Sequence, residues 1–260
     1  PDIAIGCGRQ AIAPLRALKA ARGEKIFTLY IQDPRTDLAH FDLIIAPQHD
    51  GLSGLNVETM IGSPNRLTPK ALKDGLEQFK QPLAALPAKK AALLIGGPSK
   101  AHTVSKRDHA EHIDAAQGLL AAGYGLMITT SRRTPDWVAH DYKALAKDNE
   151  AIWLYDGGEP NPYFAFLAAS SLTLVTQEST NMLTEACCAS APVFRLPMSG
   201  KAGKFKHLYD ALKTRSLVER YAGQAEDKNF TPLTKAPLNE TARMAERALA
   251  HFDARGKALN

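Results

Sequence analysis

The fold of this chain is decided by the stretch from Asp156 to Pro197, DGGEPNPYFAFLAASSLTLVTQESTNMLTEACCASAPVFRLP. Asn161 and Pro162 suit the start of a helix, and an apolar run follows them. The stretch predicts a helix at 163–169, a buried strand at 172–175, a polar turn at 177–181 that opens onto a second helix, and a strand from 192. This alternation indicates an α/β fold with a parallel sheet, in which ligands bind beyond the carboxyl ends of the strands.

The second helix of this stretch has two different sides. Its apolar residues fall on one side at helical spacing and are expected to pack on the sheet: Met182, Leu183, Ala186 and Cys187. The polar residues fall elsewhere: Glu178, Asn181 and Glu185, with Ser179 at the helix start. A helix N-terminus suits a phosphate, and a carboxylate two turns further on can accept hydrogen bonds from ribose hydroxyls. An ordinary capped helix with a solvated face explains the same pattern, so both interpretations stay open.

Two more polar turns follow predicted buried strands. The strand at 91–95 leads into Gly96-Gly97-Pro98-Ser99-Lys100, whose glycines let the backbone approach a ligand closely, although the Lys-Ser/Thr pair of a P-loop is missing. The strand at 124–129 precedes Ser131, Arg132 and Arg133, which are suited to bind a diphosphate because guanidinium groups pair with phosphate oxygens. A plain turn and a charged loop are the alternatives.

The first part of the chain carries two further candidates. Gly6 to Ala11 fits G-x-G-x-x-A between a strand and a helix, which is a weak dinucleotide-binding pattern; close packing of helix on strand explains it as well. His49 and Asp50 follow the strand predicted at 41–46, where an imidazole can act as a general base. A solvated turn is the alternative for this pair.

Composition limits the classes of function. The net charge of +5 favours anionic ligands or an anionic membrane surface, and no nucleic-acid-binding motif is present. The cysteines show no metal or redox spacing, which predicts reduced thiols and a cytoplasmic protein. His109 and His112 lie three residues apart, but a charged outer helix face explains them and we expect no metal site there.

The sequence also predicts a domain division. The segment 81–90, QPLAALPAKK, has two prolines and two lysines and is the expected linker, giving domains at 1–86 and 87–260. A long final helix is expected at 239–254. The chain opens on Pro1 directly before a strand, and its first domain is short, so we expect that domain to be incomplete at its N-terminus.

Several stretches resemble a known family. The run from Thr176 to Met182, continued by Thr184-Glu185-Ala186 and Ala191-Pro192-Val193, resembles the donor-binding region of two-Rossmann (GT-B) glycosyltransferases. More closely, the chain resembles the family named after the plant elongated-mitochondria fission protein, which has many bacterial members. The further matching stretches follow in order along the chain: 46–50, 56–57, 96–99 and 129–135.

The resemblance implies two Rossmann-like domains with parallel sheets facing a cleft, the last helix packing back on the first domain. It implies a glycosyltransferase-like protein that binds a nucleotide sugar as substrate, needs no essential metal or other cofactor, and transfers sugar to a cell-envelope or lipid-linked acceptor. The implied nucleotide-binding residues are Gly97, Ser99, Ser131, Arg132, Arg133, Glu178, Ser179, Asn181 and Glu185. His49 or Asp50 would activate the acceptor, and Gly8, Arg9 and Asn56 would lie on the acceptor side.

Two other functions remain open. The plant namesake is associated with recruiting fission machinery to mitochondria, so the chain is alternatively a non-catalytic adaptor, peripheral at the inner face of a membrane. The third possibility is an NAD-dependent nucleotide-sugar epimerase, which is based on the Gly6–Ala11 turn. The sugar, base, acceptor and oligomeric state are not specified by the sequence.

Overall fold

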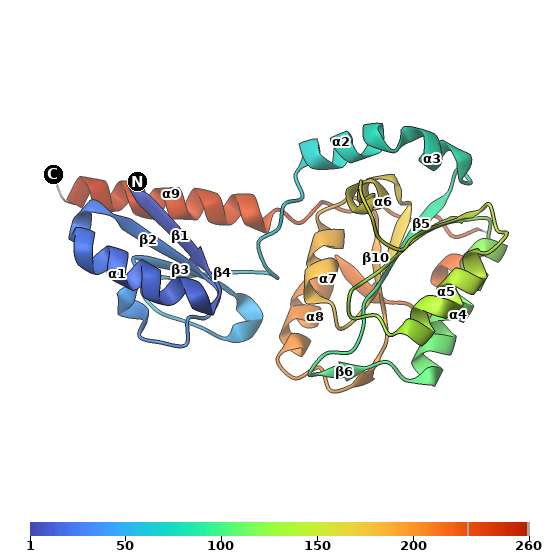
Figure 1. Ribbon diagram of the computed structural model, residues 1–260, viewed down its shortest axis with the longest axis horizontal. Helices are drawn as coiled ribbons and strands as arrows, with labels where there is room; N and C mark the ends of the chain where they lie inside the picture. Colours follow the sequence, from blue (N-terminus) through green and yellow to red (C-terminus); the bar gives the residue numbers. More distant parts are fainter. Residues whose placement is uncertain (228, 259–260) are drawn as a thin grey trace. The chain divides into compact units, whose positions relative to one another are not determined.

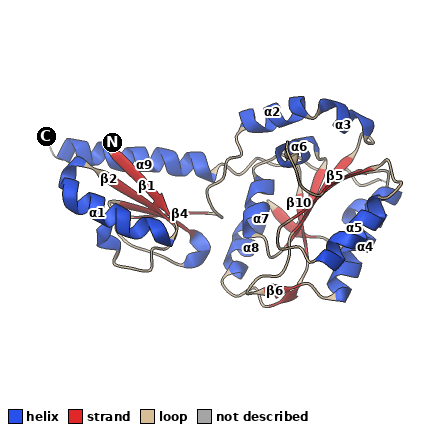
Figure 2. Cartoon of the chain, in the orientation of Figure 1, coloured by secondary structure: helices blue, strands red, loops and turns tan. Residues whose placement is uncertain are grey.

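The computed structural model describes residues 1–227 and 229–258. The chain forms two compact units, one made of Pro1–Pro64 together with the chain from Asn239 onward, and one made of Asn65–Leu238 (Figure 1). Each unit holds its own parallel sheet with helices on both faces (Figure 2). The predicted α/β fold with two parallel sheets is therefore confirmed.

The first unit contains a four-stranded parallel sheet in the order β1-β2-β3-β4. Its strands are β1 (Ile3–Cys7), β2 (Phe27–Ile31), β3 (Leu43–Pro47) and β4 (Val57–Met60). Helix α1 (Ile12–Arg22) lies on one face and helix α9 (Glu240–Ala258) on the other (Figure 1). Short 3₁₀ turns link these elements: η1 (Arg9–Ala11), η2 (Gly23–Lys25), η3 (Leu38–His40) and η4 (Gln48–Asp50).

Alternation along β3 explains why both faces of this sheet are covered. Leu43 and Ile45 pack with Met244 of α9, whereas Ile44 packs with Leu15 of α1. Successive side chains of a strand point to opposite faces, so a strand that is apolar at every position needs a helix on each side.

Polar contacts hold α9 on the first unit. Arg255 donates to the carbonyl oxygen of Ile26 at 2.8 Å and to the carboxylate of Glu24. At the other end of the helix, Glu240 Oε2 accepts from the backbone N–H of Ile61 at 2.8 Å. The helix expected at 239–254 thus returns to the unit that contains the first strands, although nearly the whole second unit separates them in sequence.

The second unit contains a six-stranded parallel sheet in the order β12-β10-β9-β5-β7-β8. Its strands are β5 (Lys90–Ile95), β7 (Gly125–Thr130), β8 (Ile152–Tyr155), β9 (Leu172–Thr176), β10 (Val193–Leu196) and β12 (Val218–Arg220). Its helices are α2 (Pro69–Gln78), α3 (Lys80–Ala85), α4 (Lys106–Ala121), α5 (Asp136–Ala146), α6 (Tyr163–Ala169), α7 (Thr180–Cys187) and α8 (Phe205–Thr214), with the 3₁₀ turn η5 (Gln224–Glu226).

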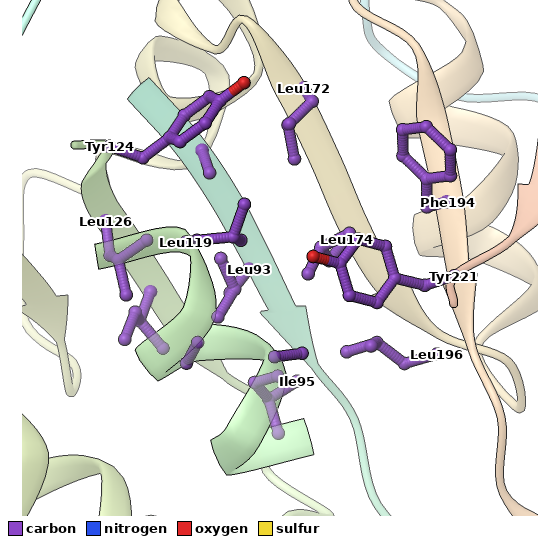
Figure 3. Close-up of a cluster of buried hydrophobic side chains, with 14 of the residues drawn as sticks. Leu93, Ile95, Leu119, Tyr124, Leu126, Leu172, Leu174, Phe194, Leu196 and Tyr221 are labelled. Carbon is purple, nitrogen blue, oxygen red and sulfur yellow. The ribbon is translucent and has the colours of Figure 1, made fainter. Parts of the chain in front are cut away.

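One hydrophobic core of this unit lies between the sheet and helices α4 and α5. Leu93 and Ile95 of β5 meet Leu119 of α4, and Leu174 and Phe194 extend the cluster across the sheet (Figure 3). Helices α7 and α8 lie on the opposite side of the sheet from α4 and α5 (Figure 1). The central strands β5, β7 and β9 are buried on both faces, which accounts for their continuous apolar sequences.

The structure corrects the predicted linker at 81–90. Lys80–Ala85 forms helix α3, and Pro82 is tolerated because it lies in the first turn, where a backbone N–H has no helical partner. Helix α2 packs against α6 of the second unit, so the boundary between units falls after Pro64 and not after residue 86.

The stretch 198–204, which has two glycines and two lysines, also contains regular structure. Its β11 (Ser199–Gly200) pairs antiparallel with β6 (His102–Thr103), and Ser199 N–H donates to Asp108 Oδ2 at 2.9 Å. This pair joins the segment after β10 to the segment after β5. Among the described residues, no helix combines the length and apolar character that a membrane crossing requires.

Candidate functional site

The strand order of the second unit defines one position for a ligand. From β5 the chain proceeds outward to β7 and β8, then returns to the other side of β5 to form β9, β10 and β12. The loops after β5 and β9 therefore diverge at a topological switch point. In open α/β sheets ligands bind outside the carboxyl ends of the strands at such a point. The predicted nucleotide-binding turns at 96–99 and 177–181 both lie there.

The two loops are joined to each other by hydrogen bonds. The N–H of Gly96 donates to Thr176 Oγ1 at 2.8 Å, and the N–H of Gly97 donates to Glu178 Oε1 at 2.9 Å. Ser99 stabilises the rest of the first loop, because its hydroxyl accepts from the N–H groups of Ala101 and His102. The glycine-rich turn is thus held in one shape by polar groups of the chain itself.

Glu178 has a different role from the predicted nucleotide contact. Its side chain is fully buried, 3.7 Å from the guanidinium of Arg133, and Oε2 has no hydrogen-bond partner among the described residues. Burial raises the pKa of the Glu178 carboxyl, while hydrogen bonds from Thr176 and Gly97 and the charge of Arg133 oppose this. Glu178 therefore supports the loops from within, and the N–H of Gly97 is engaged by it.

The loop after β7 completes the support. Thr134 Oγ1 donates toward the carbonyl oxygens of Ile95 and Gly96, at 3.0 and 2.8 Å, and Arg133 Nη1 donates to the carbonyl oxygen of Pro98 at 3.0 Å. Ser131 is half-buried and its hydroxyl lies 3.2 Å from Thr134 Oγ1. Arg132 is exposed beside these residues. The guanidinium group of Arg133 consequently lies at the carboxyl edge of the sheet, beside the glycine-rich loop, and Arg132 precedes it in the same turn.

Helix α7 begins directly after this group. Ser179 occupies its N-cap position and is buried, and Asn181 is exposed on the first turn. The expected packing side is present, since Leu183, Ala186 and Cys187 are buried; Met182 is half-buried.

Glu185 lies one turn and a half into α7 and is paired with a residue that the sequence did not suggest. Tyr163, the first residue of α6, donates its hydroxyl to Glu185 Oε2 at 2.7 Å. Burial raises the pKa of Glu185, and the Tyr163 hydrogen bond and the charge of Arg66 act in the opposite direction.

A second polar group that sequence reasoning missed lies at the carboxyl ends of β9 and β10. Arg195 Nη1 donates to Gln177 Oε1 at 2.6 Å and the guanidinium lies 4.6 Å from the ring centroid of Tyr209, whose hydroxyl donates to the Gln177 carbonyl oxygen. Gln177 also reaches the carbonyl oxygen of Met198 at 2.7 Å. An arginine inside the apolar strand VFRL was the available sequence signal.

The residues predicted for the acceptor side lie in the first unit. His49 is buried and its Nε2 lies 3.8 Å from Asp50 Oδ1, directly after β3. Asn56 has a structural role instead, because its amide donates to the carbonyl oxygens of Leu38 and Phe41 at 2.9 and 2.8 Å. Gly8 is half-buried and Arg9 is exposed at the turn after β1.

The histidines considered as metal ligands have other partners. His109 Nε2 lies 2.9 Å from Asp141 Oδ2, and His112 Nε2 lies 2.7 Å from the carbonyl oxygen of Pro197. Within the described part of the chain, no group of three or more His, Cys, Asp or Glu is placed to hold a metal ion. Cys7, Cys187 and Cys188, all within the described residues, form no disulfide bond, and Cys187 is buried.

Two parallel α/β units, with a polar site at the switch point of the second, define an α/β protein of the two-Rossmann, GT-B-like class. A model of the family described as "Mitochondrial fission ELM1" matches residues 1–252, so the chain belongs to this family. The mitochondrial fission protein ELM1 of Arabidopsis thaliana is 28% identical over 284 residues, an alignment that covers all of this chain. The chain spans 66% of the length of that relative.

Solved structures with a similar fold include nucleotide-sugar enzymes. The UDP-GlcNAc 2-epimerase of Methanocaldococcus jannaschii superposes with a TM-score of 0.57 at 11% identity, covering 96% of this chain and 77% of the other. The UDP-GlcNAc 2-epimerase of Neisseria meningitidis, bound to UDP-GlcNAc, gives a TM-score of 0.51 at 14% identity, covering 98% and 70%. At such identities these structures show the shared fold alone.

Proposed function

We propose that this protein binds a nucleotide sugar at the carboxyl edge of the second unit's sheet and transfers the sugar to an acceptor. The observation that carries this proposal is the convergence of Arg133, the loop of Gly96 and Gly97, and the N-terminus of α7 at the switch point between β5 and β9. The diphosphate of a nucleotide sugar carries the negative charge that a guanidinium group and a helix N-terminus can bind. Glu185 lies further along α7, where we expect the ribose.

The chemistry follows from the leaving group. In sugar transfer, an acceptor oxygen forms a bond to the anomeric carbon as the bond from that carbon to the phosphate oxygen breaks. The nucleoside diphosphate leaves with additional negative charge. Arg132, Arg133 and the positive end of α7 would stabilise this charge, which is often a large part of catalysis. No metal or other cofactor is assigned to this step. The acceptor proton would pass to His49 or Asp50, which stays a prediction.

The nature of the ligands is part of the proposal. Two of the similar epimerase structures hold bound UDP-GlcNAc, so UDP and UDP-sugars are the first probes to use. A cell-envelope or lipid-linked acceptor remains our expectation, together with contact of the protein with an anionic membrane surface and a cytoplasmic location.

A binding experiment tests the proposal. Thermal unfolding is followed with UDP, UDP-GlcNAc, ADP and GDP; a ligand at about 100 times its Kd adds roughly 2.7 kcal/mol to the stability. Arg132→Ala should weaken the affinity roughly tenfold, or about 1.4 kcal/mol, because it removes an exposed charge beside the loop. Arg16→Ala, on α1 of the first unit, is the matched control and should change nothing. Wild-type protein that binds none of the nucleotides at millimolar concentration rejects the proposal.

One observation favours a second candidate, a non-catalytic adaptor. The N–H of Gly97 is engaged by the buried Glu178, so a protein side chain occupies a backbone donor that phosphate-binding loops often offer to their ligand. Binding of a UDP-sugar without release of UDP in the presence of candidate acceptors would support the adaptor. Release of UDP that depends on the acceptor would support the transferase.

The NAD-dependent alternative gains no support from the Gly6–Ala11 turn. A Cβ atom on Gly6 would lie 2.4 Å from Leu15 Cδ1, so this glycine is needed for α1 to pack on β1. Close packing of helix on strand explains the pattern without a dinucleotide.

A further inference from the structure

A hydrogen bond connects the two helices that flank β9. Tyr163 begins α6, which precedes β9, and Glu185 lies on α7, which follows it. The Tyr163 hydroxyl donates to Glu185 Oε2 at 2.7 Å, and both side chains are half-buried. No described residue donates a hydrogen bond to the other carboxylate oxygen, Oε1, and that atom is not among the fully buried polar atoms without a partner. The carboxylate is therefore held by one oxygen and open at the other.

The surroundings of this pair keep Tyr163 as the hydrogen-bond donor and Glu185 as the acceptor. Burial raises the pKa of the Glu185 carboxyl, while the Tyr163 hydroxyl and the charge of Arg66 favour its ionised form. Burial also raises the pKa of Tyr163 well above its ordinary value, with the nearby Glu185 acting in the same direction. The tyrosine consequently stays a donor and the glutamate an acceptor. A hydrogen bond to a charged group fixes geometry more strongly than one between neutral groups.

We propose that Tyr163 is a positioning residue for nucleotide binding: it holds Oε2 of Glu185 so that Oε1 is presented to a ribose hydroxyl. This inference rests on the proposed function, because it names how the carboxylate expected to read the ribose is oriented. A carboxylate that rotates freely must lose this freedom when it binds, and a fixed one does not. The pair thereby makes the site selective for a ribonucleotide over a nucleotide that lacks the ribose hydroxyls.

The substitution Tyr163→Phe isolates the hydroxyl from the ring. The ring lies beside Phe164, with centroids 6.1 Å apart, and the fully buried Phe166 follows on the same helix. Phenylalanine keeps the ring contacts, so only the donor to Glu185 is lost. Tyr155→Phe is the matched control, because Tyr155 ends β8 and the substitution removes a hydroxyl that donates to the carbonyl oxygen of Gly158.

The experiment compares affinities for UDP and for 2′,3′-dideoxy-UDP by titration calorimetry. The wild type should bind UDP about tenfold more tightly than the dideoxy analogue. Tyr163→Phe should weaken UDP binding about tenfold and leave binding of the analogue unchanged. Glu185→Gln should behave similarly, and the double variant should lose no more than Glu185→Gln alone, because Tyr163 acts through Glu185. Tyr155→Phe should match the wild type for both ligands.

The results that would overturn this inference differ from those that would overturn the proposed function. An equal loss of affinity for both ligands in Tyr163→Phe shows a general structural effect and overturns the inference, as does unchanged or tighter UDP binding. Wild-type protein that fails to bind UDP overturns the proposed function itself. A readout without ligand is available from ¹³C-carboxyl NMR, in which Tyr163→Phe should raise the pKa of Glu185. An unchanged titration of Glu185 also overturns the inference.

Discussion

Substitution of Gly96 by alanine tests whether the buried carboxylate of Glu178 is the group that shapes the switch-point loops. A Cβ atom on Gly96 would lie 1.7 Å from Glu178 Oε1 and 3.0 Å from Thr176 Oγ1. Gly96 is buried and its backbone has no positive φ, so the strain of Gly96→Ala arises from this overlap and not from the backbone conformation. Glu178 must move, and its bond from the N–H of Gly97 is lost.

Two costs contribute to the expected loss of stability. Loss of a hydrogen bond to a charged or buried acceptor costs about 1.5–3 kcal/mol. Insertion of a carbon into a closely packed site costs about 1–3 kcal/mol. We expect a total of about 4 kcal/mol for Gly96→Ala. For a unit of this size each kcal/mol lowers Tm by about 2–4 °C, which predicts a fall of about 10 °C in the transition of the second unit.

Urea unfolding followed by circular dichroism gives the free energies for a double-mutant cycle. Glu178→Ala removes the side chain with which the added methyl group would collide, so Gly96→Ala combined with Glu178→Ala should be little less stable than Glu178→Ala alone. The coupling should be at least about 2 kcal/mol. If the losses of stability in the two single variants simply add, Gly96→Ala does not act through Glu178. The role assigned to the carboxylate would then be wrong.

Two further predictions concern charge. Because burial raises the folded-state pKa of Glu178 above its ordinary 4.5, the stability that this group contributes is present below pH 4.5 and is lost as pH rises through the folded value. Glu178→Gln should therefore gain stability relative to the wild type as pH rises through that window in parallel urea titrations; a constant difference between the two proteins would contradict this. In the first unit, Arg255→Ala should cost about 2 kcal/mol, since this arginine has a side chain only 16% exposed and bonds to Glu24 and the backbone. Arg107→Ala, which breaks an exposed pair with Glu111, should change the free energy of unfolding by no more than about 0.5 kcal/mol. Equal losses of stability in Arg107→Ala and Arg255→Ala would show that Arg255 does not hold α9.

The family and the secondary structure could be predicted because their signals are local. The helix at 163–169 was placed correctly from its apolar run and its Asn-Pro start, and the strand after it from its β-rich residues. The order of strands and helices indicated a parallel sheet for the same reason. The turns at 96–99, 131–133 and 177–181 follow their strands as expected, because the carboxyl ends of parallel strands meet at one edge.

The errors occurred where distant residues decide the outcome. Pro82 suggested a linker, but a proline in the first turn of a helix removes no helical hydrogen bond, and α2 belongs to the second unit because it packs on α6, which is far later in the chain. Likewise, the sequence of 198–204 contains no strand pattern, and β11 exists because β6 offers it a partner.

The sequence by itself determined the class of fold, the family and which polar loops follow the strands. Only the tertiary structure decided which polar side chains of those loops face inward. Glu178 and Glu185 are both acids beside the same helix start, yet one is buried beneath Gly97 and the other is held by Tyr163. The physical reason is that the direction of a side chain in a loop depends on the donors that neighbouring strands bring to it, and those donors are remote in sequence.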